Sequence, residues 1–199
     1  MLSPQVKQTP KKNMSKLVVF NQLSLDGYFT DKYGDMTWAK ENSDAEFDEF
    51  TTENARGGGT LLFGRVTYDL MASFWPTPQA AKMLPLVAER MNNLPKAVFS
   101  RTMKEASWKN TKVIKGDIAA QIRKMKKESG EGMAIFGSGN IVSQLAKTGL
   151  IDEYQIVLNP IALGAGRTMF EGIKERLHLK LTKSRVFKNG KVFLCYEPA

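Results

Sequence analysis

Short apolar runs alternate with amphipathic segments along the first three quarters of this chain. The runs predict buried strands at residues 17–20, 60–63, 96–100, 111–115, 133–136 and 154–158. Helical patterns lie between most of them, at residues 43–56, 65–71, 79–92, 117–129 and 140–148. Strands that alternate with helices in this way are typical of βαβ units, in which the strands pair in parallel. We therefore expect an α/β fold with an open, mostly parallel sheet and helices on both faces.

The last quarter of the chain has a different pattern. Residues 177–187 and 191–196 both show partial alternation of apolar and polar side chains, and Asn189-Gly190 lies between them. Asn-Gly favours a two-residue turn in which both residues take a positive φ. We therefore expect an antiparallel hairpin at the C-terminal edge of the sheet, which makes the sheet mixed.

Composition limits the classes to which the chain can belong. A length of 199 residues predicts one domain, which we place at residues 14–199, after a polar and disordered tail at residues 1–13. His178 and Cys195 are the only residues of their types, so we expect no intrachain disulfide and no metal site. We also expect a cytoplasmic protein without a membrane span, because the sequence has neither a long apolar run nor a signal-like N-terminus.

The net charge of +9 favours an anionic partner, either nucleic acid or a phosphorylated small molecule. The basic residues are widely spread, and ordinary solvated faces of helices and strands would explain them equally well. No known nucleic-acid motif is present. We therefore expect a small-molecule partner rather than nucleic acid.

Three strand-to-helix junctions carry residues suited to binding phosphate, at residues 63–67, 99–102 and 136–140. In open α/β sheets ligands bind beyond the carboxyl ends of the strands, where helix N-termini present free N–H groups. Arg65 and Arg101 follow their strands directly, and either could grip a phosphate monoester with a hydrogen bond of roughly 1.5–3 kcal/mol. Simple tight turns remain the alternative, because Gly137-Ser138-Gly139 is only a fragment of the dinucleotide fingerprint.

The junctions resemble those of a known group of enzymes. Residues 60–68 (TLLFGRVTY), 98–102 (VFSRT), 135–140 (IFGSGN) and 36–38 (MTW) resemble segments of dihydrofolate reductases. Residues 24–28 (SLDGY), 91–96 (MNNLPK), 149–154 (GLIDEY) and 159–166 (NPIALGAG) are similar to the reductase domain of riboflavin biosynthesis and its stand-alone bacterial relatives. The resemblance runs from about Lys16 to Pro198 and implies a three-layer dihydrofolate-reductase-like fold.

The resemblance also implies a function and a cofactor. It implies an NADPH-dependent reductase, commonly a homodimer, that transfers a hydride to a pyrimidine, a pterin or a related small heterocycle. The cofactor-binding residues that it implies are Gly64, Arg65 and Thr67 for the 2′-phosphate, Ser100 and Arg101 for the adenosine, Gly137, Ser138, Gly139, Asn140 and Ile141 for the pyrophosphate, and Gln22 and Phe29 for the nicotinamide.

Two carboxylates are candidates for the proton donor that such a reduction usually needs. Asp48 precedes Gly64 by sixteen residues, the spacing of the substrate-binding acid in dihydrofolate reductases, and Asp26 follows the first strand. Either could instead be structural, Asp48 as a solvated helix residue and Asp26 as a turn residue. On the substrate side, we expect Trp38 to contact the substrate and Arg167 to hold a phosphate or carboxylate, unless residues 164–167 are only a flexible connection.

Two other functions stay open at this point. The chain could be a non-catalytic module of the same fold that binds nucleotides or nucleic acid, or a member that keeps the cofactor site without turnover. Binding to nucleic acid would fall steeply with salt. An assay of NADPH oxidation against a panel of heterocycles would distinguish a reductase from a member without turnover.

Overall fold

The computed structural model describes residues 14–55, 57–128, 130–173 and 175–199, so the predicted tail lies outside it. Its centre is an eight-stranded sheet in the order β5-β4-β3-β6-β1-β7-β10-β9. The parallel strands, in sheet order, are β5 (Thr111–Ile114), β4 (Lys96–Phe99), β3 (Thr60–Gly64), β6 (Met133–Phe136), β1 (Leu17–Ser24) and β7 (Glu153–Asn159). The predicted α/β fold with a mostly parallel sheet is confirmed.

The antiparallel edge is the predicted C-terminal hairpin of β9 (Leu179–Val186) and β10 (Val192–Pro198). Its connection differs from the predicted two-residue turn. Phe187 N–H donates to Lys191 O, which encloses three residues, and of these only Gly190 has a positive φ, at 83°. A three-residue loop that ends in a left-handed glycine is the next most common hairpin connection.

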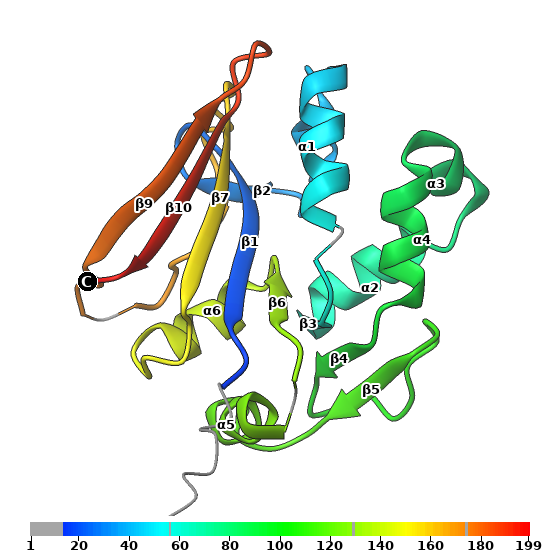
Figure 1. Ribbon diagram of the computed structural model, residues 1–199, viewed down its shortest axis with the longest axis vertical. Helices are drawn as coiled ribbons and strands as arrows, with labels where there is room; N and C mark the ends of the chain where they lie inside the picture. Colours follow the sequence, from blue (N-terminus) through cyan, green and yellow to red (C-terminus); the bar gives the residue numbers. More distant parts are fainter. Residues whose placement is uncertain (1–13, 56, 129, 174) are drawn as a thin grey trace, which may run out of the picture.

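Helices cover both faces of the sheet (Figure 1). On one face α5 (Ile118–Glu128) and α6 (Gly139–Ala146) pack on the strands, for example Ile122 and Leu145 on Val19. The other face carries two separate clusters. One belongs to α2 (Arg65–Phe74) and α4 (Pro85–Asn93), and the other joins Phe47 and Phe50 of α1 (Ala45–Ala55) to β7 and β10. A short helix, α3 (Pro78–Met83), precedes α4.

Period-two alternation explains why one strand serves both faces. Leu62 of β3 belongs to the cluster under α5 and α6, whereas its neighbours Leu61 and Phe63 belong to the cluster under α2 and α4. No helix in the described part of the chain combines the length and the apolar character that crossing a membrane requires.

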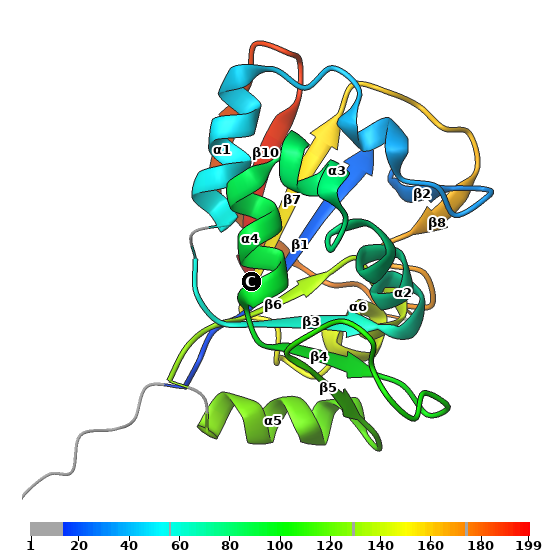
Figure 2. The same cartoon turned by 90° about the vertical axis from the view of Figure 1, so that its right-hand side faces the viewer.

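A small second sheet was not predicted from the sequence. β2 (Tyr28–Asp31) pairs antiparallel with β8 (Gly166–Thr168), and the 3-10 helix η1 (Thr37–Lys40) follows β2. A side chain at Gly166 would place its Cβ 1.9 Å from Thr30 O, so the close approach of these two strands requires glycine there. This small sheet lies at the carboxyl end of β1 and continues the edge where the predicted junctions meet (Figure 2).

Candidate functional site

A groove of about 1250 Å³ lies at the carboxyl ends of the parallel strands. Figure 2 shows the arrowheads of β3, β4 and β6 pointing to the side of the molecule where α2, α6, β2 and β8 lie. In sheet order, the groove is lined by residues that follow β5 (115–118), β4 (100–102), β3 (64–67), β6 (138–141) and β1 (29–36). All three junctions that the sequence singled out therefore meet in one cavity.

Most of the predicted binding residues line this groove. They are Phe29, Gly64, Arg65, Thr67, Ser100, Arg101, Ser138, Gly139, Asn140, Ile141 and Arg167. The remaining five do not line it: Gln22, Asp26, Trp38, Asp48 and Gly137. Gly137 nevertheless lies directly behind the wall, because a Cβ on it would be 2.9 Å from Cγ2 of Thr67.

Hydrogen bonds join the junction after β3 to the junction after β6. Gly64 N–H donates to Ser138 Oγ at 2.7 Å, and Ser138 N–H donates to Thr67 Oγ1 at 3.1 Å. Gly137 and Ser138 have φ of 58° and 57°, and such left-handed backbone turns the chain sharply from β6 into α6. The hydroxyl of Thr67 therefore fixes the groove wall in this structure, in addition to any role with a ligand.

The start of α6 differs from the sequence-based expectation. The helical pattern in the sequence begins at Asn140, but in the structure the N-cap is Ser138, whose carbonyl accepts from Ile141 N and Val142 N, and Asn140 lies within the helix. A Cβ on Gly139 would meet Phe29 Cε1 and Thr168 O at 3.0 Å. Glycine at this position therefore allows α6 to pack closely against β2 and β8.

The charges that line the groove favour an anion. Its cationic residues are Arg65, Arg101, Lys115 and Arg167, and its acidic residues are Asp117 and Glu171. The carboxylate of Asp117 accepts from Ala120 N–H at 2.7 Å and so caps α5. Arg65 donates through Nε to Asp69 at 2.8 Å, which leaves its terminal nitrogens available, one of them 3.5 Å from Thr102 Oγ1. Three of the four cations follow β3, β4 and β5, at one end of the groove. This donor set suits a ligand that carries phosphate groups.

The opposite end is largely apolar, and Phe29 is the one of its apolar residues to which the sequence assigned a role. Phe29, Tyr33 and Met36 line the groove there, and Tyr33 is 82% exposed. Val66 and Leu70 of α2 add apolar side chains to the wall of the same groove. Tyr33 and Met36 come from the segment after β2. Met36 belongs to residues 36–38, whose resemblance to dihydrofolate reductases is noted above, whereas no feature of the sequence indicated Tyr33. At the cationic end, Lys115 could have been predicted from the sequence, because residues 115–117 follow a parallel strand as the three predicted junctions do.

Two residues predicted to act on the substrate side lie in other surroundings. Trp38 is 5% exposed, and its indole N–H donates to Asp35 O at 3.2 Å. Asp48 is partly buried on α1 and accepts from Ser43 Oγ at 2.7 Å. The helical pattern in the sequence begins at Ser43, but the cap of α1 is Asp44, whose carboxylate accepts from Phe47 N–H. These side chains stabilise η1 and the start of α1.

The carboxylate of Asp26 joins the turn after β1 to the loop after β7. It accepts hydrogen bonds from Ser24 Oγ at 2.6 Å, from Gly164 N–H at 2.7 Å and from Leu163 N–H at 3.1 Å. These bonds, that of Ser24 first, lower the pKa of Asp26 to about 2. A carboxyl with this pKa stays ionised near neutral pH, which disfavours the role of proton donor considered above.

We expect the Asp26→Asn variant to lose stability at neutral pH without losing affinity for a groove ligand. The native pKa lies below the ordinary value of 3.8, so the ionised form stabilises the fold above that value, and this stabilisation is lost as the pH falls toward about 2. Thermal melts should therefore separate wild type from variant at pH 7 and bring them together near pH 2. A constant difference across this range would contradict the structural role.

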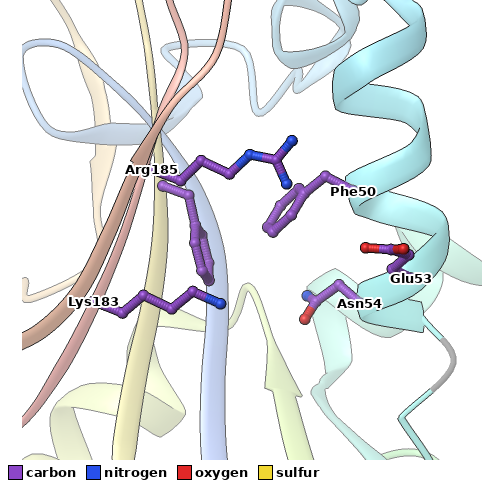
Figure 3. A pocket seen from close by; sticks show the side chains of 6 residues that line it. Phe50, Glu53, Asn54, Lys183 and Arg185 are labelled. Carbon is purple, nitrogen blue, oxygen red and sulfur yellow. The ribbon is translucent and has the colours of Figure 1, made fainter.

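A second and smaller cavity, of about 250 Å³, lies between α1 and the β9–β10 hairpin. Figure 3 shows Phe50, Glu53 and Asn54 of α1 facing Lys183 and Arg185 of β9. Arg185 is engaged with Glu46 at 3.0 Å. This cavity lies away from the carboxyl ends of the parallel strands and holds none of the predicted site residues.

The comparisons with known proteins agree with this fold. A model of the RibD C-terminal domain family matches residues 15–193. The uncharacterized protein YyaP of Bacillus subtilis (strain 168) is 26% identical over 181 residues, which cover 91% of this chain and 94% of YyaP.

Two solved structures resemble the fold of this chain. A putative riboflavin biosynthesis protein from Shewanella sp. PV-4 superposes with a TM-score of 0.71 at 26% identity, covering 92% of this chain and 99% of that one. A dihydrofolate reductase from Enterococcus faecalis, solved with NADP(H), superposes with a TM-score of 0.60 at 14% identity, covering 92% and 96%. The second likeness is one of fold alone, and it confirms the dihydrofolate-reductase-like architecture.

Proposed function

The chain belongs to the RibD C-terminal domain family, and on that basis we propose that it is an NADPH-dependent reductase of a small heterocycle. The substrate class is a pyrimidine, a pterin or a related ring with a reducible C=N or C=O bond. The observation that carries the proposal is the cationic end of the groove. There Arg65, Arg101 and Lys115 follow three neighbouring parallel strands and face one cavity.

Each part of the proposed cofactor has residues of matching chemistry. Arg65 and Arg101 would hold the 2′-phosphate and the adenosine side, because guanidinium groups bind phosphate in a bidentate manner. The start of α6, from Ser138 to Ile141, would receive the pyrophosphate. Ser138 N–H and Ile141 N–H are engaged with Thr67 Oγ1 and Ser138 O, so the contact would come from the N–H groups of Gly139 and Asn140 in the first turn of the helix. The neutral reduced ring would then lie toward Phe29, where the groove is apolar.

The remaining residues of the apolar end suit the substrate. When bound, the cofactor supplies the hydride. Tyr33 and Met36 provide apolar surface on which a flat ring can lie and from which it can displace water. Arg167 of β8 is exposed at this end and would bind an anionic substituent of the substrate.

Fluorescence titration with NADPH and with NADH tests the cofactor assignment. We expect saturable binding of NADPH and weaker binding of NADH, because only NADPH carries the 2′-phosphate. The adenosine half alone, 2′,5′-ADP, should compete with NADPH. If neither NADPH nor NADH binds at concentrations up to the millimolar range, the proposed function is wrong.

Turnover needs a separate test, because a protein of this fold could bind the cofactor without reducing anything. Oxidation of NADPH, followed by its absorbance, should accelerate with at least one member of a panel of pyrimidines and pterins. Tight binding without turnover on any member would favour the non-catalytic alternative. We also expect a homodimer, which light scattering would detect as twice the chain mass of 22.3 kDa.

A further inference from the structure

The cavity of about 250 Å³ between α1 and the C-terminal hairpin takes no part in the function proposed above. The periodicity of two elements brings its polar side chains together. Lys183 and Arg185 are two residues apart on β9, so both point to the face of the sheet that α1 covers. Phe50, Glu53 and Asn54 have the i, i+3, i+4 spacing of one helical face and lie opposite the strand (Figure 3).

The floor of the cavity is aromatic. Phe50 and Phe193 are 8% and 3% exposed, and their ring centroids are 4.7 Å apart. Both rings belong to the cluster through which α1 packs on β7 and β10. β9 is the edge strand of the sheet and is exposed along almost its whole length. A small molecule can therefore reach this floor between the helix and the edge strand.

Two opposite charges in the cavity have no partner within the part of the chain that the structure describes. Neither the ammonium group of Lys183 nor the carboxylate of Glu53 forms a hydrogen bond or an ion pair there, although they lie on facing walls. Arg185, by contrast, donates to Glu46 at 3.0 Å and lies over the ring of Phe187. Of the charged residues that line the cavity, this leaves one cation and one anion for a ligand.

These features define a ligand by its chemistry. A lysine without a partner binds a carboxylate, and a glutamate without a partner binds an ammonium group, so a molecule that carries both groups satisfies both walls. The aromatic floor favours an apolar side chain on the same molecule. The volume is below the roughly 300–1,000 Å³ of pockets for drug-sized ligands, so the ligand is small. An α-amino acid with an apolar side chain combines all of these properties.

We propose that this cavity binds a free α-amino acid with an apolar or aromatic side chain. Lys183 holds its carboxylate, Glu53 holds its ammonium group, and its side chain lies on Phe50 and Phe193. A phosphate is disfavoured in the same place, because the Glu53 carboxylate would repel it. The cavity shares no lining residue with the groove, so this inference goes beyond the proposed function and does not depend on it.

NMR titration of the full chain with L-phenylalanine and with L-leucine tests the site. We expect saturable changes in the amide chemical shifts of α1 and β9, with a Kd on the order of millimolar, because the ligand is small and its charges stay partly exposed. Two analogues separate the two walls. N-acetyl-L-phenylalanine lacks the ammonium group and L-phenylalaninamide lacks the carboxylate, so each should bind more weakly than L-phenylalanine.

Two substitutions remove the charges of the protein one at a time. Lys183→Met and Glu53→Gln should each raise the Kd for L-phenylalanine about five-fold or more. Each variant should lose only the contribution of its own group. Lys183→Met should therefore bind L-phenylalaninamide as wild type does, and Glu53→Gln should bind N-acetyl-L-phenylalanine no more weakly than wild type does. A merely structural change at either position would weaken all of these ligands together.

Lys180→Met is the matched control, because Lys180 is an exposed lysine of the same strand that does not line the cavity. It should leave the Kd for L-phenylalanine unchanged. Lys183 and Glu53 are exposed as well, so thermal melts of the three variants should match wild type.

Three results would overturn the inference. The first is the absence of shift changes on α1 and β9 with either amino acid at concentrations up to tens of millimolar. The second is a pattern of changes confined to the groove. The third is an unchanged Kd for L-phenylalanine in both Lys183→Met and Glu53→Gln. None of these results affects the proposed function, since NADPH is assigned to the groove.

Discussion

Replacing Arg65 with alanine is expected to raise the Kd for NADPH by about 10- to 150-fold, because a hydrogen bond to a charged group contributes roughly 1.5–3 kcal/mol. Arg65 is the first residue of α2, and its side chain is exposed to the groove. Asp69 holds the guanidinium through Nε at 2.8 Å, so the remaining nitrogens are already directed across the groove toward Thr102. The Kd for NADH should hardly change, since that cofactor lacks the 2′-phosphate.

Fluorescence titration of both cofactors against wild type and variant measures this change in preference. Arg123→Ala is a matched control, because Arg123 is an exposed arginine on α5 that does not line the groove. The control removes the same charge and should leave both affinities at wild-type values. If Arg65→Ala raised the Kd for NADPH and the Kd for NADH by the same factor, Arg65 would contact a part of the cofactor that both molecules share. An unchanged Kd for NADPH would exclude Arg65 from the binding site.

Replacing Lys96 with methionine is expected to destabilise the fold by roughly 3 kcal/mol, since a removed buried cation leaves its acceptors unsatisfied. The side chain is 1% exposed, and Nζ donates to Met91 O, Asn92 O and Leu94 O at 2.9, 3.1 and 2.7 Å. These carbonyls belong to the C-terminal end of α4, where no intrahelical donor is available. Methionine preserves the volume and removes all three donors. Urea denaturation measures the loss as a lower midpoint at an unchanged slope.

The size of this loss should also depend on pH. Burial lowers the pKa of Lys96 from 10.5 to about 8, so between these values the unfolded chain binds more protons than the folded one. Wild type therefore gains stability through this group as the pH rises from about 8 to 10.5, and Lys96→Met lacks the gain. The difference between wild type and variant should be larger at pH 10 than at pH 7. Lys112→Met, which replaces an exposed lysine on neighbouring β5, should change stability little at either pH. A similar loss in both variants would contradict the role given to Lys96.

Local patterns were sufficient for the main sheet and for Arg65 and Arg101 at the cationic end of the groove. Parallel strands appear in a sequence as short apolar runs, and the residue after each run lies at the same edge of the sheet. The junctions at residues 63–67, 99–102 and 136–140 were identified on this ground, and the structure places residues of all three in one cavity. The same rule applied to the strand that ends at Ile114 would have added Lys115.

Contacts between distant segments could not be predicted in this way. β8 has only three residues and pairs with a strand about 140 positions earlier, so neither strand shows a pattern of its own. Trp38 resembles a loop residue that meets substrate, yet packing of η1 on the sheet buries it. Asp26 has the sequence of a turn residue, and only the fold shows that its carboxylate also holds the loop at Leu163 and Gly164.

The sequence by itself determined the order along the chain of the strands and helices of the main sheet, and it identified Arg65 and Arg101 at the ends of two of its strands. Both follow from interactions within a few residues, namely the periodicity of apolar side chains and the backbone freedom of glycine. Only the tertiary structure decided the order of strands in the sheet, the apolar end of the groove and the partners of the Asp26 carboxylate. Whether a side chain is buried, and which groups it contacts, depends on every segment packed around it, and these segments are brought together only by the fold.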